Sequence, residues 1–164
     1  MKALTHLIDK VIEKFLILLM AVMVLSVTWQ VVTRFLMASP SSYTEELARF
    51  LLIWIGVLGG SYALRTRSHL GIDILAKKLN PGQREILNIF VYSLILLFSV
   101  LIMLVGGIKL VALTFLLDQT SASLGIKMGY IYLVLPISGT VMLIYSLDVI
   151  FDSYKVVRAG RRDR

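Results

Sequence analysis

The sequence lacks cysteine and is poor in proline and in charged residues. It contains 0 Cys and 3 Pro, and 16% of its residues are charged whereas 58% are hydrophobic. The absence of cysteine excludes disulfides, thiolate metal sites, iron–sulfur clusters and redox relays built on paired cysteines. Because about a quarter of the residues in a typical soluble domain are charged, this balance predicts a membrane protein and argues against a soluble enzyme.

The few charges that are present are mostly basic. Lys and Arg total 17 against 10 Asp and Glu, which gives a formal net charge of +7 and a pI near 9.8. In a membrane chain, an excess of Lys and Arg is typical of cytoplasmic loops that lie beside anionic lipid. We therefore expect the lipid bilayer, and no nucleic acid, as a partner of this protein.

Four uncharged apolar runs account for most of the hydrophobic content. Each run, with its flanks, is long enough to cross a hydrocarbon core of about 30 Å as a helix. The first run follows three lysines and has about 19 residues, too many for an ordinary signal-peptide core, so we expect it to be retained. The runs are Phe15–Thr33, Phe50–Leu64, Ile86–Ile108 and Met128–Leu147.

The positions of Lys and Arg predict the orientation of the helices. Most of these residues lie at the amino end, between the second and third runs, and in the tail, so both termini should be cytoplasmic. We predict an all-α membrane protein with four transmembrane helices and short amphipathic interfacial helices. The single membrane domain 1–164 divides into an interfacial helix 1–14, transmembrane helices at about 15–36 and 43–65, a short amphipathic helix 71–79, a long tilted transmembrane helix 82–117, a fourth transmembrane helix 128–154 and a basic tail 155–164.

The third and fourth helices contain the residues that can interrupt them. Gly106-Gly107 is the only interruption between Pro81 and Leu117, so a continuous third helix could reach about 55 Å at roughly 1.5 Å per residue. Tilt, a kink at the glycine pair or protrusion into water would absorb the surplus length. Pro136 is expected to kink the fourth helix and to free carbonyls near Tyr132.

The sequence contains no recognisable catalytic or cofactor-binding constellation. Each of the ten acidic residues can reach an interface, so no buried carboxylate is expected for a proton relay. His6 and His69 lie in predicted cytoplasmic segments, where they cannot ligate a haem between helices. We therefore predict that the protein is not an enzyme and binds no cofactor or metal. Lys109, towards the outer end of the third helix, can snorkel to the interface, and its role stays open.

A group of charges marks the start of the second helix. Ser42 and Glu45 have the spacing of a capping box, and Glu45 and Glu46 place negative charge where exposed helix amides favour it. Arg49 follows at the three- and four-residue spacing that allows an ion pair on one helix face. This group either caps a transmembrane helix or orients a helix that contacts a partner.

Small residues follow on the same helix. Gly56 and Gly60 form a small-xxx-small pair, and Gly59 and Ala63 form a second pair beside it. Such pairs allow two helix backbones to approach closely. Packing within this chain and packing against another subunit are both compatible with the pattern.

The motifs between Arg34 and Asp73 resemble those of a transporter family. Arg34-Phe35 follows the first helix, Glu45-Glu46-Leu47-Ala48-Arg49-Phe50 leads to Trp54, Gly59 and Gly60, and Arg65, His69-Leu70 and Asp73 come next. This pattern resembles the small membrane subunit (DctQ-like) of tripartite ATP-independent periplasmic (TRAP) transporters. The second half of the chain is similar to the family in hydropathy rather than in motifs.

The resemblance implies a multi-pass protein of a bacterial or archaeal inner membrane that works with two partners. A large TRAP membrane subunit would carry the substrate and sodium sites and move as an elevator. A periplasmic substrate-binding protein would deliver an organic acid. The small subunit would be a non-catalytic scaffold for this cation-coupled uptake.

By motif position, the resemblance and the residue pattern assign three sets of residues. The structural and interface polar cluster comprises Glu45, Glu46 and Arg49 near the periplasmic interface and Arg65, His69 and Asp73 on the cytoplasmic side. The helix-packing set comprises Gly56, Gly59 and Gly60. The candidate docking positions for the binding protein comprise Ser39, Ser41, Tyr43, Asp118 and Lys127.

Two other functions stay open at this point. The chain could act alone as a homo-oligomeric transporter or channel, with Gly56 and Gly60 at the subunit interface. It could also be a membrane enzyme or redox subunit, although the missing cysteines weigh against that role. Recovery of the chain together with a much larger polytopic subunit would favour the scaffold.

Overall fold

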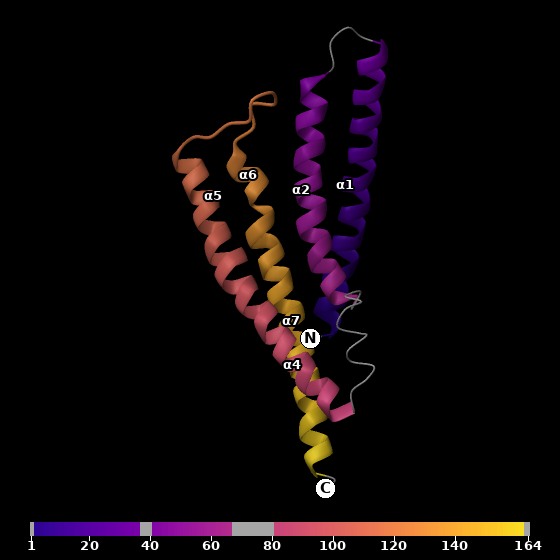
Figure 1. The fold of residues 1–164 in the computed structure, drawn as a ribbon, viewed down its shortest axis with the longest axis vertical. Coiled ribbons are helices and arrows are strands. Elements are labelled where there is room, and N and C mark those ends of the chain that lie inside the picture. Colours follow the sequence, from indigo (N-terminus) through magenta and orange to yellow (C-terminus); the bar gives the residue numbers. More distant parts are fainter. Residues whose placement is uncertain (1, 37–40, 67–80, 163–164) are drawn as a thin grey trace.

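The computed structural model describes residues 2–36, 41–66 and 81–162. This part of the chain is built from helices, which fall into four long segments because α4, η1 and α5 run on from one another and α6 leads directly into α7 (Figure 1). The elements are α1 (Lys2–Leu36), α2 (Ser42–Arg65), α4 (Pro81–Phe98), the π-helix η1 (Ser99–Gly106), α5 (Gly107–Leu116), α6 (Met128–Tyr132) and α7 (Val134–Arg162).

Each of the four segments is long and apolar enough to cross a membrane. The apolar runs fold as helices because, in lipid, every backbone N–H and C=O group must find its hydrogen-bond partner within the segment. The prediction of an all-α protein with four transmembrane helices is therefore confirmed for the described residues. The candidate spans are Thr5–Leu36, Ser42–Arg65, Gly82–Leu116 and Met128–Arg158.

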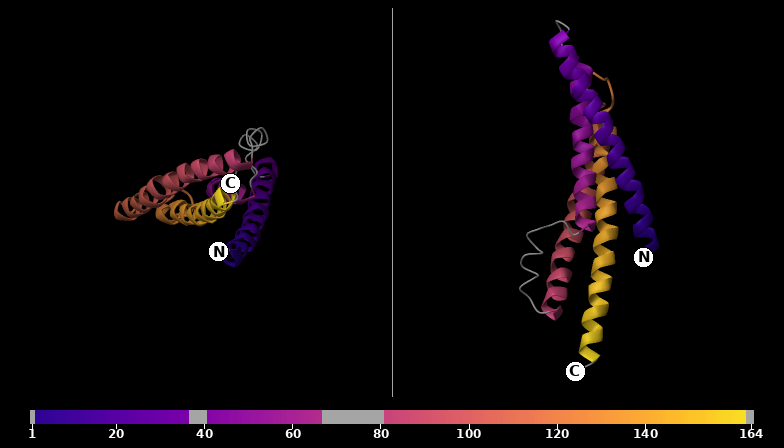
Figure 2. Two further views of the ribbon diagram at one scale, coloured as in Figure 1. Left: turned by 90° about the horizontal axis from the view of Figure 1, so that it is seen from below. Right: turned by 90° about the vertical axis from the view of Figure 1, so that its right-hand side faces the viewer.

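The segments form two pairs that meet where α2 contacts α7 (Figures 1 and 2). In one pair, α1 packs along α2; in the other, α4 and η1 pack along α7 while α5 packs against α6. The two pairs lie close together in the lower half of Figure 1 and diverge towards its top. The amino-terminal end of α1 and the carboxy-terminal end of α7 both lie towards the lower end, as expected for an even number of crossings.

The chain buries little of its apolar surface within itself. Each span contains a stretch of 18 residues that is its most apolar part. The fraction of these residues that is buried inside the protein is 6% for the α1 span, 22% for α2, 11% for the α4–α5 span and 39% for the α6–α7 span. The remaining apolar surface must contact lipid or another protein, because the exposure of so many apolar side chains to water is unfavourable. The buried apolar cluster consists of Leu64, Tyr92 and Val149, with Ile95, Met142 and Ile150 packed against it.

The third and fourth segments are irregular where they touch each other. Pro136 has no N–H to bond the carbonyl of Tyr132, and the helix is interrupted at Leu133, so the expected kink takes the form of a short break between α6 and α7. Gly107, which follows the π-helix, fits closely against this break. A Cβ at Gly107 would lie only 3.0 Å from Leu135 Cβ and 3.1 Å from Pro136 Cδ. Gly107, and not Gly106, thus permits the close helix contact.

The sequence also predicts three shorter segments. The segment 1–14 is expected as a separate interfacial helix, but its described residues 2–14 continue directly into the first span within α1, because α1 contains no glycine or proline. The short helix expected at 71–79 lies outside the described residues. The segment expected as a basic tail begins as helix, since α7 continues to Arg162.

Candidate functional site

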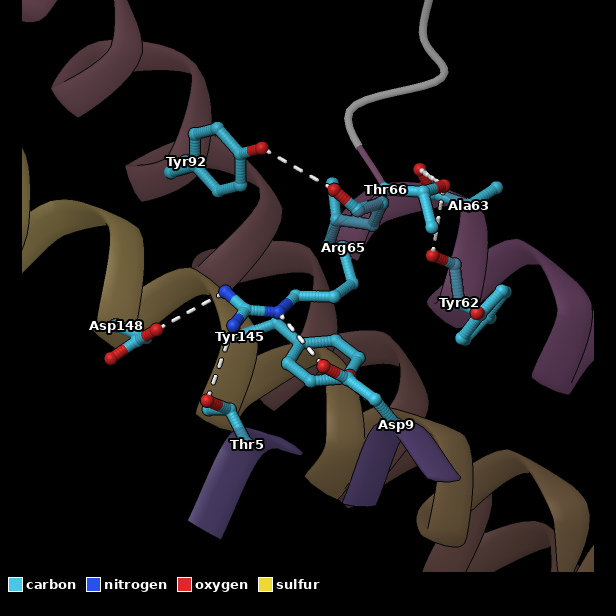
Figure 3. Close-up of polar contacts among 10 residues, drawn as sticks. Thr5, Asp9, Tyr62, Ala63, Arg65, Thr66, Tyr92, Tyr145 and Asp148 are labelled. Carbon is cyan, nitrogen blue, oxygen red and sulfur yellow. Dashed lines mark hydrogen bonds and ion pairs between the residues drawn. The ribbon is translucent and has the colours of Figure 1, made fainter. Parts of the chain in front are cut away.

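The most extensive polar cluster in the described part of the chain lies where α1, α2 and α7 meet (Figure 3). Its centre is Arg65, in the last turn of α2. The Arg65 Nε lies 3.3 Å from Asp9 Oδ2, and one terminal nitrogen lies 3.2 Å from Asp148 Oδ2. The other terminal nitrogen donates to Thr5 Oγ1 at 3.2 Å. One guanidinium group therefore joins three helices, and we call this set, with Tyr145, the Arg65 cluster.

Tyr145 of α7 completes the Arg65 cluster. Its hydroxyl donates a hydrogen bond of 2.6 Å to Asp9 Oδ1, and its ring centroid lies 5.6 Å from Arg65 Cζ. A guanidinium group over an aromatic ring gains a cation–π attraction. Because Tyr145 is fully buried, its hydroxyl needs a partner, and Asp9 supplies it.

The Arg65 cluster is shielded from water to different degrees. The side chain of Asp148 is 6% exposed, whereas those of Arg65 and Asp9 are 27% and 25% exposed. The expectation of no buried carboxylate is wrong for Asp148, whose charge is compensated by Arg65 from α2. Removal of one partner from a buried ion pair leaves the other charge uncompensated, so such a pair holds its helices strongly in place.

The family resemblance groups Arg65 with His69 and Asp73. Both of these residues lie outside the described residues, so that grouping stays a prediction. The partners that the structure shows were missed, because the contacts of Arg65 with α1 and α7 span 56 to 83 positions of sequence. The one available signal in the sequence was that Asp9 and Asp148 belong to predicted helix ends on the same side of the membrane as Arg65.

A second polar joint lies at the other end of α2. Glu46 Oε1 accepts a hydrogen bond from the N–H of Ala122 at 3.1 Å, and Oε2 accepts from Ser123 and Leu124 at 2.9 and 2.7 Å. Three consecutive amides thus surround one carboxylate, an arrangement typical of anion-binding backbone turns. Glu46 thereby ties the loop between α5 and α6 to α2.

The loop between α5 and α6 is also held by its own contacts. Thr120 and Lys127 form an antiparallel bridge, and Lys127 Nζ lies 3.0 Å from Asp118 Oδ1. This ion pair raises the pKa of Lys127 above its ordinary value. Asp118 and Gly125 have φ values of 46° and 64°, the left-handed conformation that the turns of a tight loop require. The loop is therefore a defined structure anchored at Glu46.

The charged residues at the start of α2 make two separate contacts. Glu45 and Arg49 form the predicted ion pair at 3.0 Å, on an exposed face of the helix. Glu46 turns to the α5–α6 loop instead of Arg49. The predicted capping box of Ser42 and Glu45 is wrong. The helix starts at Ser42 with Ser41 as N-cap, so Ser42 lies one position too far along, and the Glu45 carboxylate bonds Arg49.

The glycines of α2 face open space within the described part of the chain. A Cβ placed at Gly56, Gly59 or Gly60 would meet no atom within 4 Å among the residues that the structure describes. The contact of α2 with α7 uses serines instead: the hydroxyls of Ser61 and Ser138 share one hydrogen bond, and the hydroxyl that accepts it can donate its own proton to the Val57 carbonyl of α2, which lies within reach of both. Close approach at these glycines by a helix of another chain stays a prediction.

The candidate docking residues lie at the end of the molecule opposite the Arg65 cluster. The start of α2, with Ser41 and Tyr43, and the α5–α6 loop, with Asp118 and Lys127, both lie towards the top of Figure 1. Tyr43 is 61% exposed, and the Asp118 and Lys127 side chains are 73% and 50% exposed. Ser39 lies outside the described residues.

Comparison with known proteins places the chain in a family. Residues 23–155 match the family model described as tripartite ATP-independent periplasmic transporters, DctQ component. The matched region includes Glu46, Arg65, Tyr145 and Asp148, but begins after Thr5 and Asp9 of α1.

Curated relatives agree with this match. The sialic acid TRAP transporter small permease protein SiaQ of Vibrio cholerae is 29% identical over 162 residues, which cover 96% of this chain and 89% of that protein. The C4-dicarboxylate TRAP transporter small permease protein DctQ of Rhodobacter capsulatus is 28% identical over 109 residues, 66% of this chain and 48% of that protein. The isethionate TRAP transporter permease protein DctMQ of Oleidesulfovibrio alaskensis is 27% identical over 160 residues, 93% of this chain and 25% of that protein. Because the family model covers most of the chain, this protein belongs to the DctQ family, the small membrane subunits of TRAP transporters.

Proposed function

We propose that this protein is a non-catalytic scaffold for the large, elevator-type subunit of a TRAP transporter, in the inner membrane of a bacterium or archaeon. The observation that carries the proposal is the match to DctMQ, in which a region similar to 93% of this chain makes up only 25% of a single permease protein. A similar region is thus joined covalently to a much longer permease in that relative. We infer that a large permease subunit is also the partner here.

The geometry suits a supporting role. The Arg65 cluster fixes the lower end of α2 to α1 and α7, and Glu46 fixes its upper end to the α5–α6 loop. Polar joints at both ends of one helix resist relative motion of the segments, because separating a partly buried charge from its partners is costly. The exposed apolar faces of the helices, above all that of α1, leave room for a second membrane protein as well as lipid.

Two surfaces are proposed for the partners. The open face of α2 at Gly56, Gly59 and Gly60 would receive a helix of the large subunit, since a backbone without side chains allows close approach. The upper end of the molecule, at the start of α2 and the α5–α6 loop, would receive a periplasmic binding protein. The substrate would be an organic acid taken up with a coupling cation, in keeping with the sialic acid, C4-dicarboxylate and isethionate named for the relatives.

Co-purification followed by reconstitution tests the scaffold. Tagged full-length protein, isolated in mild detergent from its native cells, should bring a large polytopic subunit with it in near-equal amount. Liposomes containing both subunits should take up an organic acid when the binding protein is present, and liposomes containing this chain alone should not. Uptake by the purified chain alone would overturn the proposal in favour of an independent homo-oligomeric transporter.

A pair of glycine variants tests the proposed face of α2. Gly60→Leu should reduce recovery of the large subunit, because the new side chain would block close approach of its helix. Gly82→Leu is the matched control, since a Cβ at Gly82 also meets no described atom within 4 Å but lies in the first turn of α4. Equal recovery with both variants would reject this face as the contact.

A further inference from the structure

The last turns of α7 carry an exposed face on which two aromatic residues are followed by two basic residues. Phe151, Tyr154, Lys155 and Arg158 recur at three- and four-residue spacing, so they share one side of the helix. Ser153, which is only 3% exposed, lies on the opposite, packed side. Phe151 and Tyr154 are 51% and 58% exposed. Packing among the described residues therefore leaves this aromatic–basic face open.

The depth of this face matches the edge of a bilayer. From Tyr130 to Phe151 the chain advances 21 positions. At about 1.5 Å per residue this is roughly 32 Å, close to the hydrocarbon thickness of about 30 Å. With the exposed ring of Tyr130 at one membrane surface, Phe151 and Tyr154 lie at the other, where aromatic side chains are favoured. Lys155 and Arg158 then lie at the depth of the lipid headgroups.

The surroundings of the face are also basic. In Figures 1 and 2 the end of α7 extends beyond the neighbouring ends of α1, α2 and α4. The sequence from Phe151 onwards has two acidic residues, Asp152 and Asp163, against five basic ones: Lys155, Arg158, Arg161, Arg162 and Arg164. Basic residues directly beyond a membrane helix attract anionic lipid, by about fivefold in affinity for each charge.

We propose that Phe151, Tyr154, Lys155 and Arg158 form a binding face for anionic phospholipid headgroups. The two rings would lie at the boundary between acyl chains and headgroups, and the two cations would bind phosphate oxygens. Contact with water alone would suit the cations but not the exposed rings, whereas a lipid interface accommodates both kinds of side chain. Helix α7 is thereby anchored at the level just beyond the Arg65 cluster, to which it contributes Tyr145 and Asp148.

Lipid retention by the full-length protein tests this face. The protein would be reconstituted in nanodiscs of equal phosphatidylglycerol and phosphatidylcholine, and native mass spectrometry would count the lipids that stay bound. The wild type should retain phosphatidylglycerol preferentially. The variant K155Q/R158Q should reduce that preference at least about fivefold, as expected for the loss of basic charge at a lipid surface. K155R/R158K, which keeps both charges, should retain it.

A matched control distinguishes an effect of this face from an effect of the protein's total positive charge. R34Q/K109Q removes two exposed positive charges elsewhere on the molecule and should leave the preference unchanged. Inorganic phosphate should not displace the bound lipid, whereas high salt should weaken its retention. An unchanged preference in K155Q/R158Q, an equal loss in both double variants, or displacement by phosphate would each overturn the proposal. The outcome does not depend on the scaffold proposal, because the test uses this chain alone.

Discussion

Replacement of Arg65 by alanine should destabilise the protein far more than replacement of Arg49, although both arginines lie on α2 and both form ion pairs. Arg65→Ala leaves Asp148, whose side chain is 6% exposed, without its cation, and also frees Asp9. Loss of one partner of a buried pair costs about 3–5 kcal/mol, and because the Arg65 side chain is 27% exposed we expect about 2–3 kcal/mol. The Arg49–Glu45 pair is 66% and 60% exposed, so its loss should cost at most about 0.5 kcal/mol.

Thermal unfolding of the full-length protein in one detergent or one nanodisc, followed by tryptophan fluorescence, measures this difference. A loss of 2–3 kcal/mol corresponds to a Tm lowered by about 5–10 °C for a chain of this size, against at most about 2 °C for Arg49→Ala. Arg65→Lys should fall between the two, since a single ammonium group cannot bond Thr5, Asp9 and Asp148 together. Equal Tm values for the two alanine variants would refute the reasoning that burial and the number of partners decide the effect.

Three further predictions concern the loop and the helix contacts. Glu46→Gln should speed hydrogen exchange at amides 122–124, and Glu45→Gln should not; unchanged exchange in both variants would show that the carboxylate does not hold the loop. Gly139→Ala should cost about 1–3 kcal/mol in unfolding, because its Cβ would lie 2.8 Å from a side-chain carbon of η1, whereas Gly56→Ala should not destabilise the chain; the reverse order would contradict the packing. The ion pair raises the pKa of Lys127 above 10.5, so its stabilisation should persist below pH 10.5 and disappear as the pH rises through the raised value; an NMR titration of this side chain with a midpoint at or below 10.5 would count against the pair.

The sequence by itself determined the helices and the class of protein. Uncharged apolar runs bounded by charged residues predict membrane helices, because hydrogen bonding in lipid must be satisfied locally and leaves few alternatives. The motif residues around Glu46 and Arg65 sufficed to suggest the family. Both inferences rest on patterns that extend over only a few turns of helix. Such patterns can be recognised without knowing which distant parts of the chain come into contact.

Only the tertiary structure decided which side chains meet. Glu46 had the spacing to pair with Arg49, yet it bonds amides 76 to 78 positions away, because the α5–α6 loop returns over the start of α2. Arg65 likewise bonds Asp148, 83 positions away, at the point where α2 crosses α7. The physical reason is the same in both cases: helix spacing decides which residues share a face, whereas the crossing of helices distant in sequence decides what that face contacts.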